Sequence, residues 1–155
     1  KTPLALIIGA VPGAIPPLMG WTAATGEISA PGLVLFAILL LWQLPHFLAI
    51  AMYSKADYAR AGILTVPVVR GDRVARLQAL AYATMLVPVS LLLVPLGVAG
   101  WLYFSVASAV GVWFALKGFR GFTPAAGTRW ARQFFFASLI YLPVLTAGLM
   151  LDALI

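Results

Sequence analysis

One short stretch of the sequence, residues 53–76, combines carboxylates with a cluster of cations. The first carboxylate is Asp57, and the basic residues around it are Lys55, Arg60, Arg70 and Arg73. A Mg2+ ion is usually held by one or two carboxylates together with phosphate oxygens and water. Basic side chains stabilise the charge on a departing diphosphate. The pattern therefore predicts a metal–diphosphate site with Asp57 as the metal ligand.

The same residues allow a simpler interpretation. Asp57 and Arg60 are three positions apart, a spacing at which an ion pair forms on a helix surface without any ligand. Asp72, between Arg70 and Arg73, is likewise expected to form a solvated ion pair. Residue types and spacing alone leave both interpretations open.

A stripe of larger side chains precedes this stretch. Trp42, His46, Ala49 and Tyr53 recur at i, i+4, i+7 and i+11, which places them on one face of a helix. Asp57 continues the same face if the helix extends beyond residue 53. One helical face would then carry an imidazole, a phenol and a carboxylate.

His46 is the only histidine in the chain, and it lies seven residues before Tyr53. Seven helical residues correspond to about 10 Å below the end of the helix. An ionisable group at that depth in a membrane is costly unless it faces a cavity or a partner, so His46 is a functional candidate. The alternative is a neutral histidine bonded to a neighbouring helix. The carbonyl freed by Pro45 is a second possible partner, with Gln43 in the same polar pocket.

Composition identifies the elements that must position these residues. Of the 155 residues, 63% are hydrophobic and only 9% are charged, whereas soluble domains carry about 25% charged residues. Residues 2–26, 28–54, 77–116 and 133–151 contain no charge, and about 20 apolar residues cross a bilayer as a helix. We therefore expect one transmembrane domain over residues 1–155, with five spans near 3–24, 31–53, 76–96, 99–118 and 131–152.

The fold class expected is all-α, a polytopic transmembrane helix bundle, because backbone groups in lipid must be satisfied within their own segment. Pro95, Gly97 and Gly100 supply the break between the third and fourth spans. Since the first residue is Lys1 and not Met, we expect the chain to be part of a longer one. The absence of cysteine excludes disulfides and thiolate metal sites.

Charge placement gives the predicted topology. With five spans, every basic residue falls on one side of the membrane, and the opposite side holds Glu27 and Asp152. The positive-inside rule makes the basic side cytoplasmic and puts the C-terminus on the other side. The net charge of +6 is thus explained by topology and lipid contact, and no nucleic-acid partner is expected. The basic residues are Lys1, Lys55, Arg60, Arg70, Arg73, Arg76, Lys117, Arg120, Arg129 and Arg132.

The stretch Trp42 to Ile63, WQLPHFLAIAMYSKADYARAGI, resembles the protohaem IX farnesyltransferases of the UbiA prenyltransferase superfamily. The opening, residues 2–26, is similar to the fifth helix of these enzymes. The shared pattern P-H-F-x-A-x-A-x-Y-x-x-x-D-Y-x-x-A-G-I, continued by P-V-V-x-G, is met by Pro45, His46, Phe47, Ala49, Ala51, Tyr53, Asp57, Tyr58, Ala61, Gly62, Ile63, Pro67, Val68, Val69 and Gly71.

The resemblance implies a nine-helix fold with two polar motifs on the cytoplasmic side. The five predicted spans would be helices five to nine, the C-terminal part of a larger domain, and residues 54–76 would be the second motif. The family lies in the inner (cell) membrane. A haem A synthase or the assembly of a terminal oxidase would be a candidate protein partner.

The implied reaction joins farnesyl diphosphate to a vinyl group of haem b, with addition of water, and gives haem O. Mg2+ assists release of diphosphate. Carried over by position, Asp57 would bind the metal, Lys55 and Arg60 would contact diphosphate, and Tyr53 would line the same pocket. The remaining residues expected to bind substrate are His46, Trp42, Tyr58, Arg70 and Arg73.

This chain departs from the family patterns at several positions, and these departures bear on the acceptor and on whether the chain is active alone. Relatives that prenylate aromatic rings carry a second aspartate four residues after the first, where this chain has Ala61, and this favours a haem acceptor. Leu64 and Thr65 stand where haem enzymes usually have Pro-Met. The chain has no asparagine, and Asp57 and Asp72 are its only acids on the basic side. Because it lacks the first motif, we predict that residues 1–155 are inactive alone.

Two other functions remain open. One is a UbiA-type prenyltransferase with a quinone or chlorin acceptor, which the mass of the product would distinguish. The other is a segment of a membrane transporter, which predicts ionisable groups along several helices. His46 is nearly the only ionisable group inside a predicted span, and this disfavours the transporter.

Overall fold

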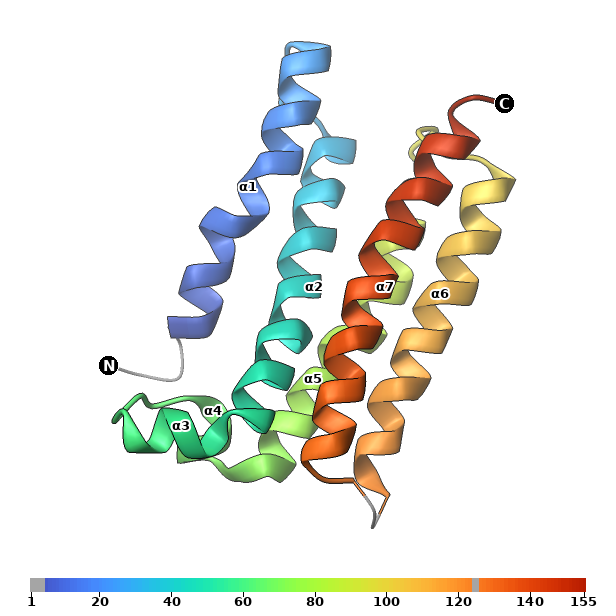
Figure 1. Ribbon diagram of the computed structural model, residues 1–155. Helices are drawn as coiled ribbons and strands as arrows, with labels where there is room; N and C mark the ends of the chain where they lie inside the picture. The colour runs from blue at the N-terminus through green and yellow to red at the C-terminus, as the bar shows by residue number, and fades with distance from the viewer. Residues whose placement is uncertain (1–4, 124–125) are drawn as a thin grey trace.

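The computed structural model describes residues 5–123 and 126–155. Lys1 and the start of the first predicted span therefore lie outside the described residues. The described part is helical and contains no strand. Its elements are α1 (Ala5–Thr25), α2 (Ala30–Tyr53), α3 (Lys55–Arg60), α4 (Val66–Val69), α5 (Gly71–Leu91), α6 (Trp101–Phe119), the 3-10 turn η1 (Arg120–Phe122) and α7 (Thr128–Asp152) (Figure 1).

Five of these helices, α1, α2, α5, α6 and α7, are long and apolar enough to cross a membrane. The predicted all-α bundle with five spans is therefore confirmed. The third span differs most from its prediction, since α5 begins at Gly71 instead of residue 76 and ends at Leu91 instead of residue 96. The prediction counted only the apolar residues of this span. The helix itself starts earlier, because its charged first turns can lie in the polar interface outside the apolar layer. The expected break follows, with Gly97 in a turn at φ +72°.

α2, α5, α6 and α7 form the packed part of the bundle, in which α2 contacts both α5 and α7 and α6 bridges these two. α5 approaches its neighbours through a stripe of fully buried alanines, Ala75, Ala79 and Ala83. Small residues allow helix backbones to come close in lipid, where packing replaces the hydrophobic effect as the driving force. Aromatic rings fill the α6–α7 contact, and Phe114 stacks on Phe134 with ring centroids 4.8 Å apart.

α1 packs along α2 at the edge of the bundle (Figure 1). Its outer surface is apolar and exposed, including Ile8 and Met19. Its inner surface contacts α2 closely at Gly13, where the buried side chain of Gln43 donates a hydrogen bond to the Ala10 carbonyl. Gln43 therefore serves the α1–α2 contact, and the prediction that it shares a polar pocket with His46 is wrong.

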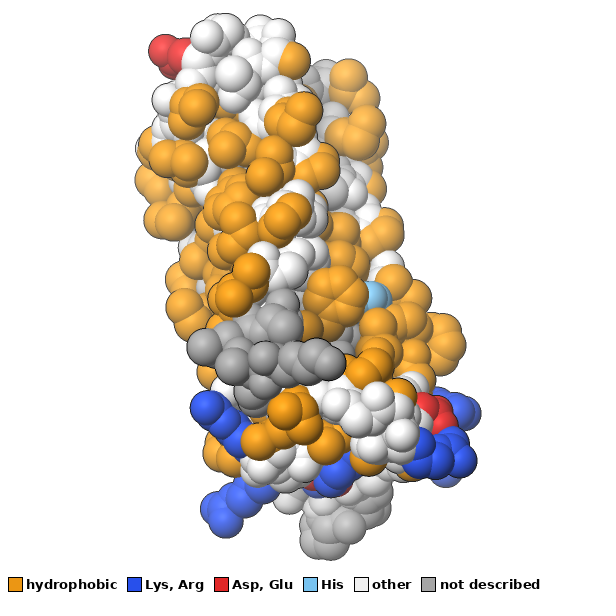
Figure 2. All heavy atoms as spheres, turned by 90° about the vertical axis from the view of Figure 1, so that its left-hand side faces the viewer, with side chains coloured by type: hydrophobic (Ala, Val, Ile, Leu, Met, Phe, Trp, Pro, Cys, Tyr) orange, Lys and Arg blue, Asp and Glu red, His pale blue; other side chains and the backbone are white. Residues whose placement is uncertain are grey.

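The chain changes direction directly after α2. Ser54 departs from helical dihedral angles, with φ −100° and ψ 18°, and α3 and α4 then lie across the end of the bundle (Figure 1). α3 ends at Arg60, and the φ of +67° at Gly62 lets the Ile63 N–H reach the Tyr58 carbonyl. Lys and Arg side chains gather at this end, below an apolar flank (Figure 2). The bundle thus presents one strongly cationic end.

Candidate functional site

Asp57 projects from α3 into solvent at the cationic end. Its side chain is 70% exposed, and one carboxylate oxygen pairs with the Arg60 guanidinium. The local ion pair expected from their spacing is therefore present. The sequence pattern suggested that Asp57 continues the helix face of Tyr53. It does not, because the helix breaks at Ser54 and Asp57 belongs to the separate helix α3. The carboxylate remains accessible to a ligand approaching the cationic end.

Lys55 lies at the start of α3 and is bound to a more distant acid. Its ammonium donates a hydrogen bond to Asp72 Oδ1 at 2.8 Å, and both side chains are about half exposed. Asp72 does form the expected ion pair, but its partner comes from 17 residues away rather than from the adjacent Arg70 or Arg73. The bond fixes α3 against the first turn of α5.

The other predicted phosphate-binding arginines, Arg70 and Arg73, flank the start of α5 with exposed side chains. Neither forms an ion pair in the part of the chain that the structure describes. Tyr58 is half-buried on α3, and no side-chain hydrogen bond engages its hydroxyl among the described residues. These groups leave donors available at the same end as Asp57.

Tyr53, the last residue of α2, faces α7. The Arg132 guanidinium lies over its ring, 5.7 Å from the centroid, and Phe135 meets it edge-on at 5.9 Å. Cation–π contacts of this kind favour a guanidinium over a flexible ammonium. Sequence reasoning treated Arg132 only as a topology signal and missed this contact. The spacing Arg132, Phe135, Ser138, three residues apart each time, marks the face that meets α2.

His46 is bonded to the neighbouring helix α7. Its Nδ1 lies 2.8 Å from the Ser138 Oγ, and Trp42, one turn earlier, donates from Nε1 to the Ser138 carbonyl at 2.7 Å. The expected alternative of a histidine with an interhelical partner is therefore present. The carbonyl freed by Pro45 is not that partner, because the ring points across to α7. Trp42, His46 and Tyr53 do share one face, as predicted.

The described carboxylates and the histidine are dispersed. Within residues 5–123 and 126–155, no three Asp, Glu or His side chains come close enough to hold a metal by themselves. Asp57 can supply one oxygen ligand, which fits Mg2+ only where phosphate oxygens, water or a further carboxylate complete the shell. The donor set therefore suits a metal that arrives with a phosphorylated substrate.

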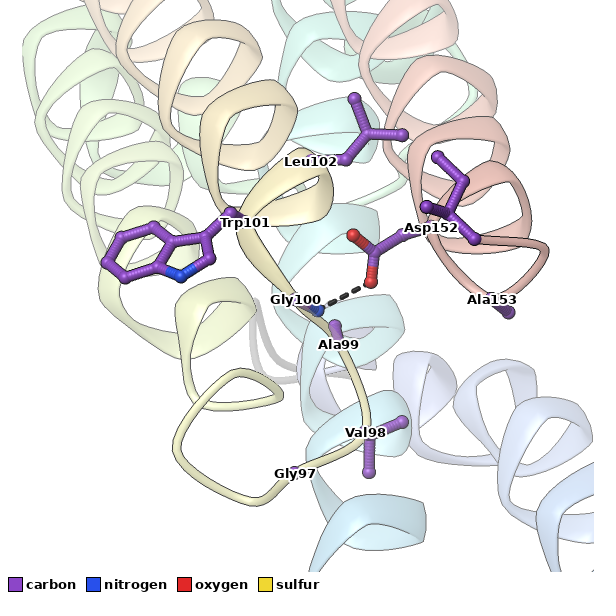
Figure 3. Close-up of a pocket in the computed structure, with 9 residues that line it drawn as sticks. Gly97, Val98, Ala99, Gly100, Trp101, Leu102, Asp152 and Ala153 are labelled. Atoms are coloured by element: carbon purple, nitrogen blue, oxygen red, sulfur yellow. Dashed lines mark hydrogen bonds between the residues drawn. The ribbon is translucent and has the colours of Figure 1, made fainter.

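Cavities lie at both ends of the bundle. One of about 480 Å³ is at the end opposite to Asp57, between the α5–α6 turn and the end of α7. There the Asp152 carboxylate accepts hydrogen bonds from the N–H groups of Gly100 (Figure 3) and Tyr103. This cavity is lined by turn backbone and apolar groups, with no cation.

Further cavities lie at the cationic end. One of about 120 Å³ is lined by Met52, Asp72, Arg76, Gly127, Thr128, Trp130 and Ala131. Another, of about 420 Å³, lies beside the start of α7 and is lined by Arg120, Thr123, Ala126, Arg129, Trp130 and Gln133.

Comparison with known proteins gives one consistent result. The family model described as "UbiA prenyltransferase family" matches residues 1–140. A protein named protoheme IX farnesyltransferase from Anaeromyxobacter sp. (strain Fw109-5) is 55% identical over 153 residues, 99% of this chain and 51% of that protein. One of the same name from Sorangium cellulosum (strain So ce56) is 50% identical over 153 residues, 99% of this chain and 55% of that protein.

A third relative with that name, from Myxococcus xanthus (strain DK1622), is 48% identical over 152 residues, 98% of this chain and 52% of that protein. The chain thus spans about half the length of the curated relatives it matches. No solved structure matches it.

Proposed function

Because this chain belongs to the UbiA prenyltransferase family, we propose that the intact protein transfers the farnesyl group of farnesyl diphosphate to a vinyl group of protohaem IX (haem b). The product would be haem O. The chain would supply the second of two polar motifs, at the cationic end formed by α3, α4 and the start of α5. The identity of 48–55% to proteins named protoheme IX farnesyltransferase supports the acceptor.

The observation that carries the proposal is the accessible carboxylate of Asp57, which is paired with Arg60 at the end of the apolar bundle where the exposed Arg70 and Arg73 also lie. A diphosphate with a long apolar tail binds where a cationic surface meets an apolar layer, because its head is anionic and its tail partitions into lipid. Asp57 would offer one ligand to Mg2+, which neutralises charge on the leaving diphosphate when bound. Arg60 already touches Asp57 and would turn its remaining donors toward phosphate oxygens.

The cations beyond α3 would hold the diphosphate from the other side of the loop. Arg70 and Arg73 are exposed and without an ion pair in the described residues, so they can meet phosphate without first breaking a bond. Lys55 would exchange part of its contact with Asp72 for the ligand. Tyr53 and Tyr58 would line the same region, and Trp42 and His46 would lie deeper, toward the haem. We further propose that the protein lies in the inner membrane and that this end is on the cytoplasmic side.

The test compares two carboxylates at opposite ends of the bundle. Asp57→Asn in the intact protein, reconstituted in vesicles with haem b, farnesyl diphosphate and Mg2+, should lower the rate of haem O formation about 10²- to 10³-fold. Glu27→Gln, an exposed acid at the other end, should keep the rate. Mass spectrometry of the product also separates haem from a quinone or chlorin acceptor. Retained farnesylation in Asp57→Asn would exclude the proposed role.

A further inference from the structure

Ser138 of α7 receives two side chains from successive turns of α2. Trp42 Nε1 donates to its carbonyl at 2.7 Å, and His46 Nδ1 lies 2.8 Å from its hydroxyl. The serine is fully buried, so its hydroxyl has no contact with solvent. The His46 bond holds the imidazole of α2 against α7, and the Trp42 bond joins the same two helices one turn away.

The hydroxyl has only one proton, and its position follows from a third contact. Ser138 Oγ lies 2.6 Å from the Phe135 carbonyl oxygen. A carbonyl can only accept, so the hydroxyl must donate there. Ser138 Oγ therefore accepts from His46, whose Nδ1 must carry the proton. In the neutral ring this leaves Nε2 unprotonated, with its lone pair free.

Nε2 of His46 has no hydrogen-bond partner among the described residues, and the side chain is partly exposed. The faces of the ring are covered by Trp42 and Phe135, each with its centroid 4.8 Å from that of His46.

We propose that Nε2 of His46 binds the iron of the haem substrate as an axial ligand; this role rests on the proposed function. A neutral imidazole whose other nitrogen donates a hydrogen bond is the usual form of a metal-bound histidine, since that bond fixes the tautomer and raises the basicity of the ligand. Proximal histidines hold haem iron in this way. The nitrogen lone pair forms the bond to iron, no proton is released, and no redox change is needed.

The position suits a porphyrin better than a phosphate. His46 lies about 10 Å from the end of α2, within the apolar layer, where an uncharged donor flanked by Trp42, Phe47 and Phe135 can take a flat apolar macrocycle. Phe47 meets the His46 ring edge-on with centroids 5.5 Å apart. Ser138 acts as a positioning residue, because it touches the imidazole and not the iron.

The experiment titrates the intact protein, in nanodiscs, with haem b and without farnesyl diphosphate. Wild type should give the absorption and resonance Raman signature of histidine-ligated iron. His46→Ala should lose that signature, and added imidazole should restore it. Ser138→Ala should weaken haem binding about tenfold, while Ser138→Thr, which keeps the hydroxyl, should bind as wild type. Asp57→Asn should keep the full signature while losing farnesyl transfer.

The outcomes separate this inference from the proposed function. A wild-type protein that makes haem O but shows no iron–histidine vibration overturns the axial ligand and leaves the function standing. The same holds if His46→Ala folds and retains the wild-type spectrum. A wild-type protein that neither binds haem nor forms haem O overturns both. If His46→Ala does not fold, Ser138→Ala decides the inference, because loss of the hydrogen bond to Nδ1 should shift the iron–histidine vibration only if His46 is the ligand. An unshifted vibration in Ser138→Ala overturns the assignment to His46.

Discussion

The Lys55 ammonium donates a hydrogen bond to Asp72 Oδ1 at 2.8 Å, which ties the first residue of α3 to the first turn of α5. The two residues lie at either end of the segment that holds α3 and α4, so this ion pair links the segment to the bundle. Lys55 is also a proposed diphosphate contact. A single residue would therefore shape the loop before substrate arrives and bind the substrate afterwards.

These two roles of Lys55 can be separated by reversing the pair. Asp72→Asn should increase amide hydrogen exchange in residues 55–69, although stability should fall by no more than about 1 kcal/mol because the pair is half exposed. Combining Lys55→Asp with Asp72→Lys should restore the protection. The apparent KM for farnesyl diphosphate should nevertheless stay raised, since position 55 is then anionic. Unchanged exchange in Asp72→Asn would show that the pair does not hold the loop.

A second prediction concerns the close contact between α1 and α2. A Cβ on Gly13 would lie 2.4 Å from Gln43 Oε1, whereas one on Gly9 would meet nothing within 4 Å. Gly13→Ala should displace the Gln43 amide from the Ala10 carbonyl and cost about 1–3 kcal/mol. Gly9→Ala, one turn away, should be neutral or slightly stabilising. Thermal unfolding in detergent measures both, and equal melting temperatures would contradict the packing described here.

Features that depend on residues close in the sequence could be predicted from it, whereas contacts between residues far apart in the sequence could not. Five helices follow from apolar runs long enough to cross a bilayer, and the position of Asp57 among cations follows from adjacent residues. The bend at Ser54 carries no proline or glycine, so no local signal marks it. The Ser138 partner of His46 is 92 residues away, and Arg132 reaches Tyr53 across the same helix pair. Only tertiary packing determines those contacts.

Arg76 holds the connection between η1 and α7. Its Nη1 donates to the Gly121 carbonyl at 2.9 Å and its Nη2 to the Ala126 carbonyl at 2.8 Å. The guanidinium also lies over Trp130, 5.6 Å from the ring centroid. Lysine keeps the charge but cannot span two carbonyls with a planar fork. Arg76→Lys should therefore speed proteolysis of this connection.

The matched control for Arg76→Lys is Arg73→Lys on the same helix, because Arg73 is exposed and has no ion pair in the described part of the chain. Its proteolysis rate at the α6–α7 connection should equal that of wild type. If both variants are cleaved at the wild-type rate, the two carbonyl contacts of Arg76 do not restrain the connection.

Asp152 caps α6 from the last turn of α7, at the end of the bundle far from the proposed site. Its carboxylate accepts hydrogen bonds from the N–H groups of Gly100 (Figure 3) and Tyr103, two donors that the start of α6 cannot satisfy within the helix. Asp152→Ala should lower the melting temperature and increase amide exchange in the first turn of α6, and Asp152→Asn should do so less because its amide oxygen still accepts. Haem O formation per folded molecule should not change. A loss of activity in a folded Asp152→Ala protein would show that the two ends of the bundle are coupled.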